Sequence, residues 1–80
     1  MFLVVGADAG VVTGVLDRAG DDDVIVLDGS AGRLLALFGQ LGDPRVWFMI
    51  GDAEVIPLPD GSADEVHGAP ASPEVARVTR

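Results

Sequence analysis

The sequence opens with Met1-Phe2-Leu3-Val4-Val5-Gly6, an apolar run that stops at a glycine. Two further runs follow, and each ends at small or acidic residues: Val24 to Leu27 before Asp28, and Val46 to Ile50 before Gly51 and Asp52. Runs without a polar interruption are typical of parallel strands that are buried on both faces. Such strands end at one edge of a sheet, where open α/β folds bind their ligands. The pattern predicts half of a nucleotide-binding domain.

The segments between these runs have helical periodicity. Apolar residues recur at helical spacing within Ala9 to Arg18, and Ser30 is placed to cap a second helix, whose apolar stripe ends at Leu41. Strand, helix, strand, helix, strand is a parallel βαβαβ unit, and its right-handed crossovers place both helices on one face of the sheet. The other face would then be bare, so we expect self-association or a partner protein to cover it.

The C-terminal part of the chain is less regular. Pro57, Pro59 and Gly61 exclude a helix directly after Ile50. We expect a short fourth strand at 64–67, whose open edge is a second place for self-association. Ser72-Pro73-Glu74 has the form of a helix N-terminus and predicts a final short helix or a frayed tail. The chain is expected to be one truncated domain, 1–80, with its core at 1–68 and the helix or tail at 69–80.

Composition excludes several classes of partner. The 80 residues carry a net charge of −8, which would repel the phosphates of a nucleic acid. No apolar run approaches the roughly 20 residues that a membrane helix needs, so no membrane is expected as a partner. Cysteine is absent, and no basic stretch or cleavage site marks a signal peptide. We therefore expect an acidic cytoplasmic protein.

Two motifs lie where a ligand would bind. The turn from Gly6 to Gly10 connects a strand to a helix, where backbone N–H groups can face a ligand, although such turns also serve as plain connections. Asp28 follows Gly10 by eighteen residues (28 − 10), near the spacing of about 20 at which nucleotide folds place an acid on the ribose hydroxyls. The alternative is that Asp28 only caps the helix that begins near Ser30.

The third segment carries a family resemblance. Gly51-Asp52-Ala53-Glu54, followed by Ile56-Pro57-Leu58-Pro59-Asp60-Gly61-Ser62-Ala63-Asp64, resembles the stretch after the third strand of class I S-adenosylmethionine-dependent methyltransferases. The resemblance runs from about Phe2 to His67. It implies an α/β fold, half of a Rossmann-like methyltransferase sheet, with parallel strands in the order 3-2-1-4 and helices mainly on one face.

The resemblance also implies which residues would bind S-adenosylmethionine. The loop around the methionine portion would be formed by Gly6, Ala7, Asp8 and Gly10. Asp28 would hold the ribose, and Asp52 with Ala53 would contact the adenine. No catalytic residue is implied, because the family's later strands and N-terminal helices, which form much of the acceptor pocket, have no counterpart here.

Two departures from the family pattern concern the first motif. Val4 stands where the family has an acidic residue, and Asp8 replaces the middle glycine, at a site where a positive φ would strain any other residue. Both predict a weakened or lost cofactor affinity. A non-catalytic interaction module that self-associates or joins a partner is therefore the alternative function. A fragment of a dinucleotide-binding oxidoreductase ranks third, because it does not explain the segment after Ile50.

Three other features have two interpretations each. His67 is either a surface histidine or a base close to substrate. Asp21 to Asp23 form a solvated turn rather than a cation site, since no further oxygen ligands are suitably spaced. Trp47 and Phe48 must point to opposite faces of their strand, so one of them is either an anchor for a partner or part of the core.

Overall fold

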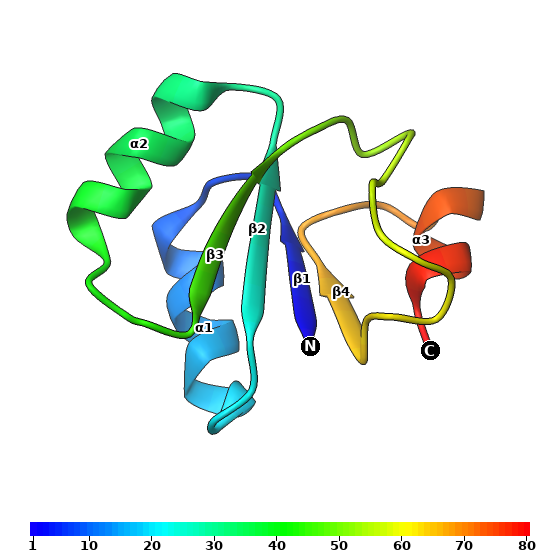
Figure 1. The fold of residues 1–80 in the computed structure, drawn as a ribbon, viewed down its shortest axis with the longest axis horizontal. Coiled ribbons are helices and arrows are strands. Elements are labelled where there is room, and N and C mark those ends of the chain that lie inside the picture. The colour runs from blue at the N-terminus through cyan, green and yellow to red at the C-terminus, as the bar shows by residue number, and fades with distance from the viewer.

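A computed structural model describes residues 1–80 as a four-stranded sheet with three helices (Figure 1). The elements are β1 (Phe2–Val5), α1 (Ala9–Ala19), β2 (Val24–Asp28), α2 (Ala31–Gln40), β3 (Val46–Ile50), β4 (Glu65–His67) and α3 (Pro73–Val78). The strand order is β3-β2-β1-β4, and every neighbouring pair is parallel. The predicted fold class and strand order are therefore confirmed. None of the three helices has the length and apolarity required to cross a membrane.

Local sequence accounts for where the helices begin. Asp8, Ser30 and Ser72 have extended backbones, and their side chains accept hydrogen bonds from the N–H groups three residues further on. These side chains satisfy donors that the first turn of a helix leaves free. Helix α1 ends at Gly20, whose φ of 62° suits glycine. The final segment forms the expected helix, with Pro73 in its first turn.

Helices α1 and α2 cover the same face of the sheet, as the right-handed crossovers predict. Nine buried apolar residues form the core on this side: Val4, Val12, Val15, Leu16, Ala19, Val24, Val26, Leu34 and Leu37. Side chains alternate along each strand, so the even-numbered residues of β1 and β2 face these helices.

The opposite face is not bare, which corrects the expectation from the sequence. Leu3 and Leu27 are fully buried there, against Ile56, Ala63 and Val78. The chain leaves β3, crosses to the far side of β1 and β4, and returns as α3, so its own C-terminal third covers β1 and β2 (Figure 1). Proline and glycine exclude helix from the crossing segment, but they do not prevent it from burying an apolar side chain such as Ile56.

On each face of the sheet, an arginine side chain stabilises the packing through hydrogen bonds to backbone carbonyls. Arg77 of α3 donates to the carbonyls of Ile56 and Leu58 and pairs with Asp60 and Glu74, which fixes α3 to the crossing segment. On the helical side, Arg45 donates to the carbonyls of Leu16 and Gly20 at the end of α1 and pairs with Asp43. The Arg45 guanidinium lowers the pKa of the Asp43 carboxyl to about 2. Each arginine thus satisfies carbonyls that helices and turns leave free.

Gly68 gives a direct test of how closely the chain after β4 packs against the end of β1. Its φ is +84°, and a Cβ atom at this position would lie 2.3 Å from the carbonyl oxygen of Val5. We expect Gly68→Ala to lower the free energy of unfolding by about 2–3 kcal/mol, because both backbone strain and the clash must be relieved. Gly14→Ala is the control, since a Cβ there meets nothing within 4 Å and helix propensity favours alanine by about 0.5–1 kcal/mol. Urea unfolding measures both, and equal stability of the two variants would contradict the packing.

Candidate ligand site at the carboxyl edge of the sheet

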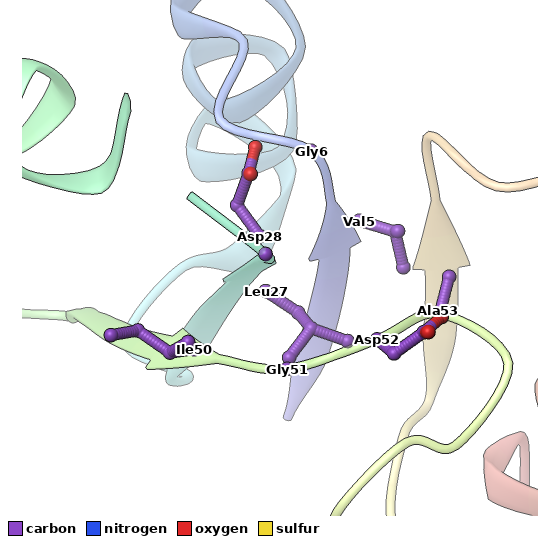
Figure 2. Close-up of a pocket in the computed structure, with 9 residues that line it drawn as sticks. Val5, Gly6, Leu27, Asp28, Ile50, Gly51, Asp52 and Ala53 are labelled. Atoms are coloured by element: carbon purple, nitrogen blue, oxygen red, sulfur yellow. The ribbon is translucent and has the colours of Figure 1, made fainter. Parts of the chain in front are cut away.

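The carboxyl ends of β1, β2 and β3 border an open cavity of about 430 Å³ (Figure 2). Its volume lies in the range of small-molecule sites, about 300–1,000 Å³. Residues from all three strand ends line it: Val5, Gly6, Leu27, Asp28, Gly29, Ile50, Gly51, Asp52 and Ala53. Four of the predicted site residues, Gly6, Asp28, Asp52 and Ala53, are therefore brought together.

The chain after β3 forms one wall of this cavity. It passes from Ile50 through Gly51 and Asp52 across the ends of β2 and β1 toward β4 (Figure 2). A Cβ atom on Gly51 would lie 2.8 Å from a methyl carbon of Leu27 and 3.4 Å from Pro57. Glycine therefore lets the backbone cross close over Leu27, which places Asp52 and Ala53 beside β1.

The carboxylate of Asp28 joins two loops. Its Oδ2 atom accepts a hydrogen bond from the N–H of Ala7 at 2.9 Å, and its Oδ1 atom accepts one from the N–H of Ser30, also at 2.9 Å. The Nε atom of Arg33 lies 3.4 Å from Oδ2. The two backbone hydrogen bonds, that from Ala7 first, lower the pKa of Asp28 below its ordinary value, with a smaller contribution from the charge of Arg33.

These contacts leave Asp28 able to accept more hydrogen bonds. A carboxylate offers about four lone-pair directions, and each oxygen of Asp28 uses one for a backbone N–H. The side chain is only 9% exposed, and the residue lines the cavity. Asp28 thus orders the strand ends, and it remains an ionised acceptor for a hydroxyl-bearing ligand. The capping alternative holds in part, because Asp28 bonds the N–H of Ser30 while Ser30 itself caps α2.

The loop from Gly6 to Gly10 is unstrained, contrary to expectation. The positive φ, +100°, belongs to Gly6, whereas Asp8 has a φ of −108°. The Oδ1 atom of Asp8 accepts a hydrogen bond from the N–H of Val11 at 3.1 Å and so caps α1. Aspartate is tolerated at this position because a cap residue adopts an extended backbone. Its carboxylate also occupies the end of α1 where an anionic ligand group would otherwise bind.

The remaining predicted residues line a second cavity. Ala7, Asp8 and Gly10 border a space of about 370 Å³ between the start of α1 and helix α2, together with Ala9, Arg33, Ala36, Leu37 and Gln40. The first loop therefore lies between the two cavities, with Gly6 lining one and Ala7 lining the other. The seven predicted residues form two adjoining groups rather than one pocket.

Asp52 has a local partner as well. Its Oδ1 atom accepts a hydrogen bond from the N–H of Glu54 at 2.8 Å, a tight turn that side chains of this kind favour. The residue is exposed, while Ala53 is half-buried beside it. This turn holds the carboxylate of Asp52 on the rim of the first cavity.

Sequence reasoning did not predict Arg33 or five of the residues that line the first cavity: Val5, Leu27, Gly29, Ile50 and Gly51. Arg33 contacts Asp28. The helix start at Ser30 could have indicated Arg33, because α2 begins at Ala31, shortly after β2 ends at Asp28. Ile50 gave no such signal, since the sequence does not distinguish an apolar residue at a strand end that faces a cavity from one that faces the core.

The other singled-out side chains lie outside this site. His67 is half-buried on β4, where its Nε2 atom lies 2.8 Å from Glu65, which also pairs with Arg18. Phe48 packs edge to face on Phe38, with ring centroids 5.7 Å apart, on the helical side. Trp47 lies on the opposite face, is 60% exposed and donates to Asp23 through its ring N–H. Phe48 therefore packs against the core, and Trp47 remains open to solvent.

Two solved structures share this fold. One is a chain described as a methyltransferase in its complex with the Trm112 methyltransferase activator of Haloferax volcanii, with a TM-score of 0.72 and 24% identity. The other is the YcgJ protein from Bacillus subtilis, with a TM-score of 0.62 and 28% identity. Each match covers 81% of this chain and 29% of the solved chain. No family model and no curated protein matches the sequence.

These likenesses show that the chain shares its fold with a part of the solved chain described as a methyltransferase and with a part of YcgJ. The chain spans less than a third of the length of either solved structure.

Because Asp28 orders this edge of the sheet, we expect its contribution to the free energy of unfolding to depend on pH. The pKa of Asp28 is lower in the folded chain than in the unfolded chain, where it is about 3.9. The ionised carboxylate therefore stabilises the fold at any pH above the unfolded-state pKa, and this stabilisation is lost as the pH falls through the folded-state pKa. The stability difference between wild type and Asp28→Asn should thus be constant above about pH 5 and shrink below about pH 4. Denaturant unfolding measures this difference, and Asp17→Asn, an exposed change of equal charge on α1, is the matched control for the loss of one negative charge. A constant difference at every pH would refute the contribution of Asp28.

Proposed function

We propose that this chain is a methyltransferase-like module that binds S-adenosylmethionine at the carboxyl edge of its sheet and is not a complete methyltransferase by itself. The observation that carries the proposal is the meeting of Gly6, Asp28, Asp52 and Ala53 around one cavity. The methyltransferase-like fold supports it, because ligands of open α/β sheets bind at this edge.

Each part of the cavity suits a part of that ligand. The free acceptor directions of Asp28 match the two ribose hydroxyls. Asp52 on the rim would accept from the adenine amino group, and the exposed apolar side chain of Ile50 provides surface for the adenine ring. Ala7, Asp8 and Gly10 would lie beside the methionine portion. There the carboxylate of Asp8 favours the ligand's ammonium group over its carboxylate.

The charge of the site fits the same ligand. Asp8, Asp28 and Asp52 are carboxylates on or beside the two cavities, and Arg33 is the cation next to them. S-adenosylmethionine carries a positive sulfonium and a positive ammonium group, so an acidic edge attracts it. When bound, it supplies a methyl group that passes to a nucleophile held in line with the carbon–sulfur bond. The residues of this chain would bind and orient it.

The two cavities account only for the cofactor side of the reaction. We propose that a second copy or another protein joins this module, and the solved neighbour from Haloferax volcanii supports this, since its methyltransferase was solved in complex with an activator protein. The absence of cysteine suits a reducing compartment, and we place the module in the cytoplasm.

The second candidate is an interaction module that no longer binds the cofactor. Two observations favour it: Asp8 occupies the N-terminus of α1, and both oxygens of Asp28 already hold backbone N–H groups. The volume of the first cavity and the free acceptor directions of Asp28 favour the first candidate, the module that binds S-adenosylmethionine.

Calorimetry with S-adenosylmethionine and S-adenosylhomocysteine separates the two candidates. We expect saturable heat and a rise in melting temperature, because a ligand that binds only the folded state stabilises it. Asp28→Ala should weaken binding at least tenfold, about 1.4 kcal/mol, and Asp52→Ala should weaken it less, because Asp52 is exposed. Asp17→Ala on α1 should bind as wild type.

Folding of each variant is checked by circular dichroism before titration. Absence of heat and of a thermal shift at millimolar ligand would reject the first candidate and leave the interaction module. Binding with unchanged affinity in Asp28→Ala would remove Asp28 from the site while keeping the ligand.

A further inference from the structure

The two edges of the sheet differ in how they are protected. Strand β4 has three residues, and Glu65 and His67 carry polar groups along it. Strand β3 has five residues, Val46-Trp47-Phe48-Met49-Ile50, and none is charged. Natural edge strands are usually short, charged or covered, because an open edge exposes unpaired backbone groups that pair with other chains. Only the β4 edge has such protection, which points to β3 as an interaction surface.

The backbone groups that β3 leaves free can be identified from its hydrogen bonds with β2. The carbonyl of Arg45 accepts from Val24, and the N–H of Gly51 donates to Asp28. Backbone groups alternate in direction along a strand, so those of residues 45, 47, 49 and 51 point to β2 and those of Val46, Phe48 and Ile50 point outward. The N–H of Val46 is used by the carbonyl of Asp43, but the other outward groups have no partner in the chain.

Apolar side chains flank this edge on both faces. On the helical side a groove of about 400 Å³ between β3 and α2 is lined only by apolar residues: Ala31, Leu34, Leu35, Phe38, Phe48 and Ile50. Leu35 is 69% exposed, and Phe38 and Ile50 are each 64% exposed. On the other face Trp47 is 60% exposed, next to Met49.

The exposed apolar area is large for a chain of this size. An aromatic side chain contributes about 150–250 Å², so Phe38 and Trp47 alone leave roughly 200–300 Å² uncovered. Leu35 and Ile50 bring the patch to the upper end of the roughly 300–600 Å² that monomers expose.

We propose that this surface binds a second copy of the chain through antiparallel pairing of two β3 strands, with the two-fold axis at Phe48. In this register Val46 lies opposite Ile50, Trp47 opposite Met49, and Phe48 opposite Phe48, so every cross-strand pair is apolar. Phe48 exchanges both of its hydrogen bonds with its copy, and the N–H of Ile50 donates to the carbonyl of Val46. The side chains and free backbone groups of β3 can therefore pair with those of a second β3 strand.

Charge also favours this contact between copies. The chain has a net charge of −8, and two copies repel each other wherever their carboxylates meet. The strand β3 and the groove beside it contain no carboxylate, so the two chains can approach there. The pairing would join two sheets into one of eight strands, place both α2 helices on one face, and set the two ligand cavities at opposite ends of the seam.

Sedimentation across a concentration series tests the proposal without any ligand, so its outcome is independent of cofactor binding. We expect a dimer at micromolar concentration that is tightened by added salt, because salt screens the repulsion between copies. Trp47→Lys and Phe38→Lys should each weaken the dimer at least tenfold. Val55→Lys, 70% exposed but outside the seam, should leave it unchanged. A wild type that remains monomeric at several hundred micromolar would overturn the proposal, as would equal effects of all three changes.

Cross-linking tests the register. The chain has no native cysteine, so an engineered one reports only its own position. Phe48→Cys would face its own copy at a Cα separation of about 5.5 Å, within the range of a disulfide. Ile50→Cys would face Val46 instead, so it should not form a disulfide-linked dimer. Equal cross-linking of the two variants, or preferential linking of Ile50→Cys, would contradict the antiparallel seam at Phe48.

Discussion

The parallel alignment of β1, β2 and β3 is the constraint on which the rest of the structure depends. Because all three strands run in one direction, their carboxyl ends meet at one edge, and one open cavity there is lined by residues that follow each of the three strands. Asp28 holds that edge together through the backbone N–H groups of Ala7 and Ser30, one from each loop that flanks it. The proposed binding chemistry therefore uses a group that also orders the fold.

Strands β1 to β3, the two crossover helices and the helix caps at Ser30 and Ser72 could be predicted from the sequence. They follow from local signals: uninterrupted apolar runs, helical periodicity, and Ser or Pro where helices begin. The strand order was implied by the family resemblance, and the cap at Asp8 was not predicted. The covering of the second face by Ile56, Ala63 and Val78 could not be predicted. Those residues are separated by prolines and glycines and have no period, and their burial depends on long-range contacts such as those of Arg77.

The sequence predicted which residues follow the strand ends, but not how these residues are divided between the two cavities. Gly6, Asp28, Asp52 and Ala53 meet because each follows a strand. The separation of Ala7, Asp8 and Gly10 into a neighbouring cavity depends on where α2 packs, which no local pattern specifies. Backbone conformation corrected the expectation for Asp8, since a residue that caps a helix is extended rather than left-handed. The proposed surface of self-association likewise follows from the contrast between the edges of β3 and β4, which becomes visible only once strand lengths and exposures are known.

The central claim is that the carboxyl edge of this sheet is a binding site for S-adenosylmethionine, and amide NMR of the labelled chain tests it most directly. On titration with the cofactor, the account predicts saturable shifts confined to the amides of Gly6, Ala7, Gly29, Gly51, Asp52 and Ala53 and their neighbours, with α3 and the amino ends of the strands unchanged. Spectra that do not change at millimolar cofactor, or shifts centred on α3 or the β3–α2 groove, would contradict it.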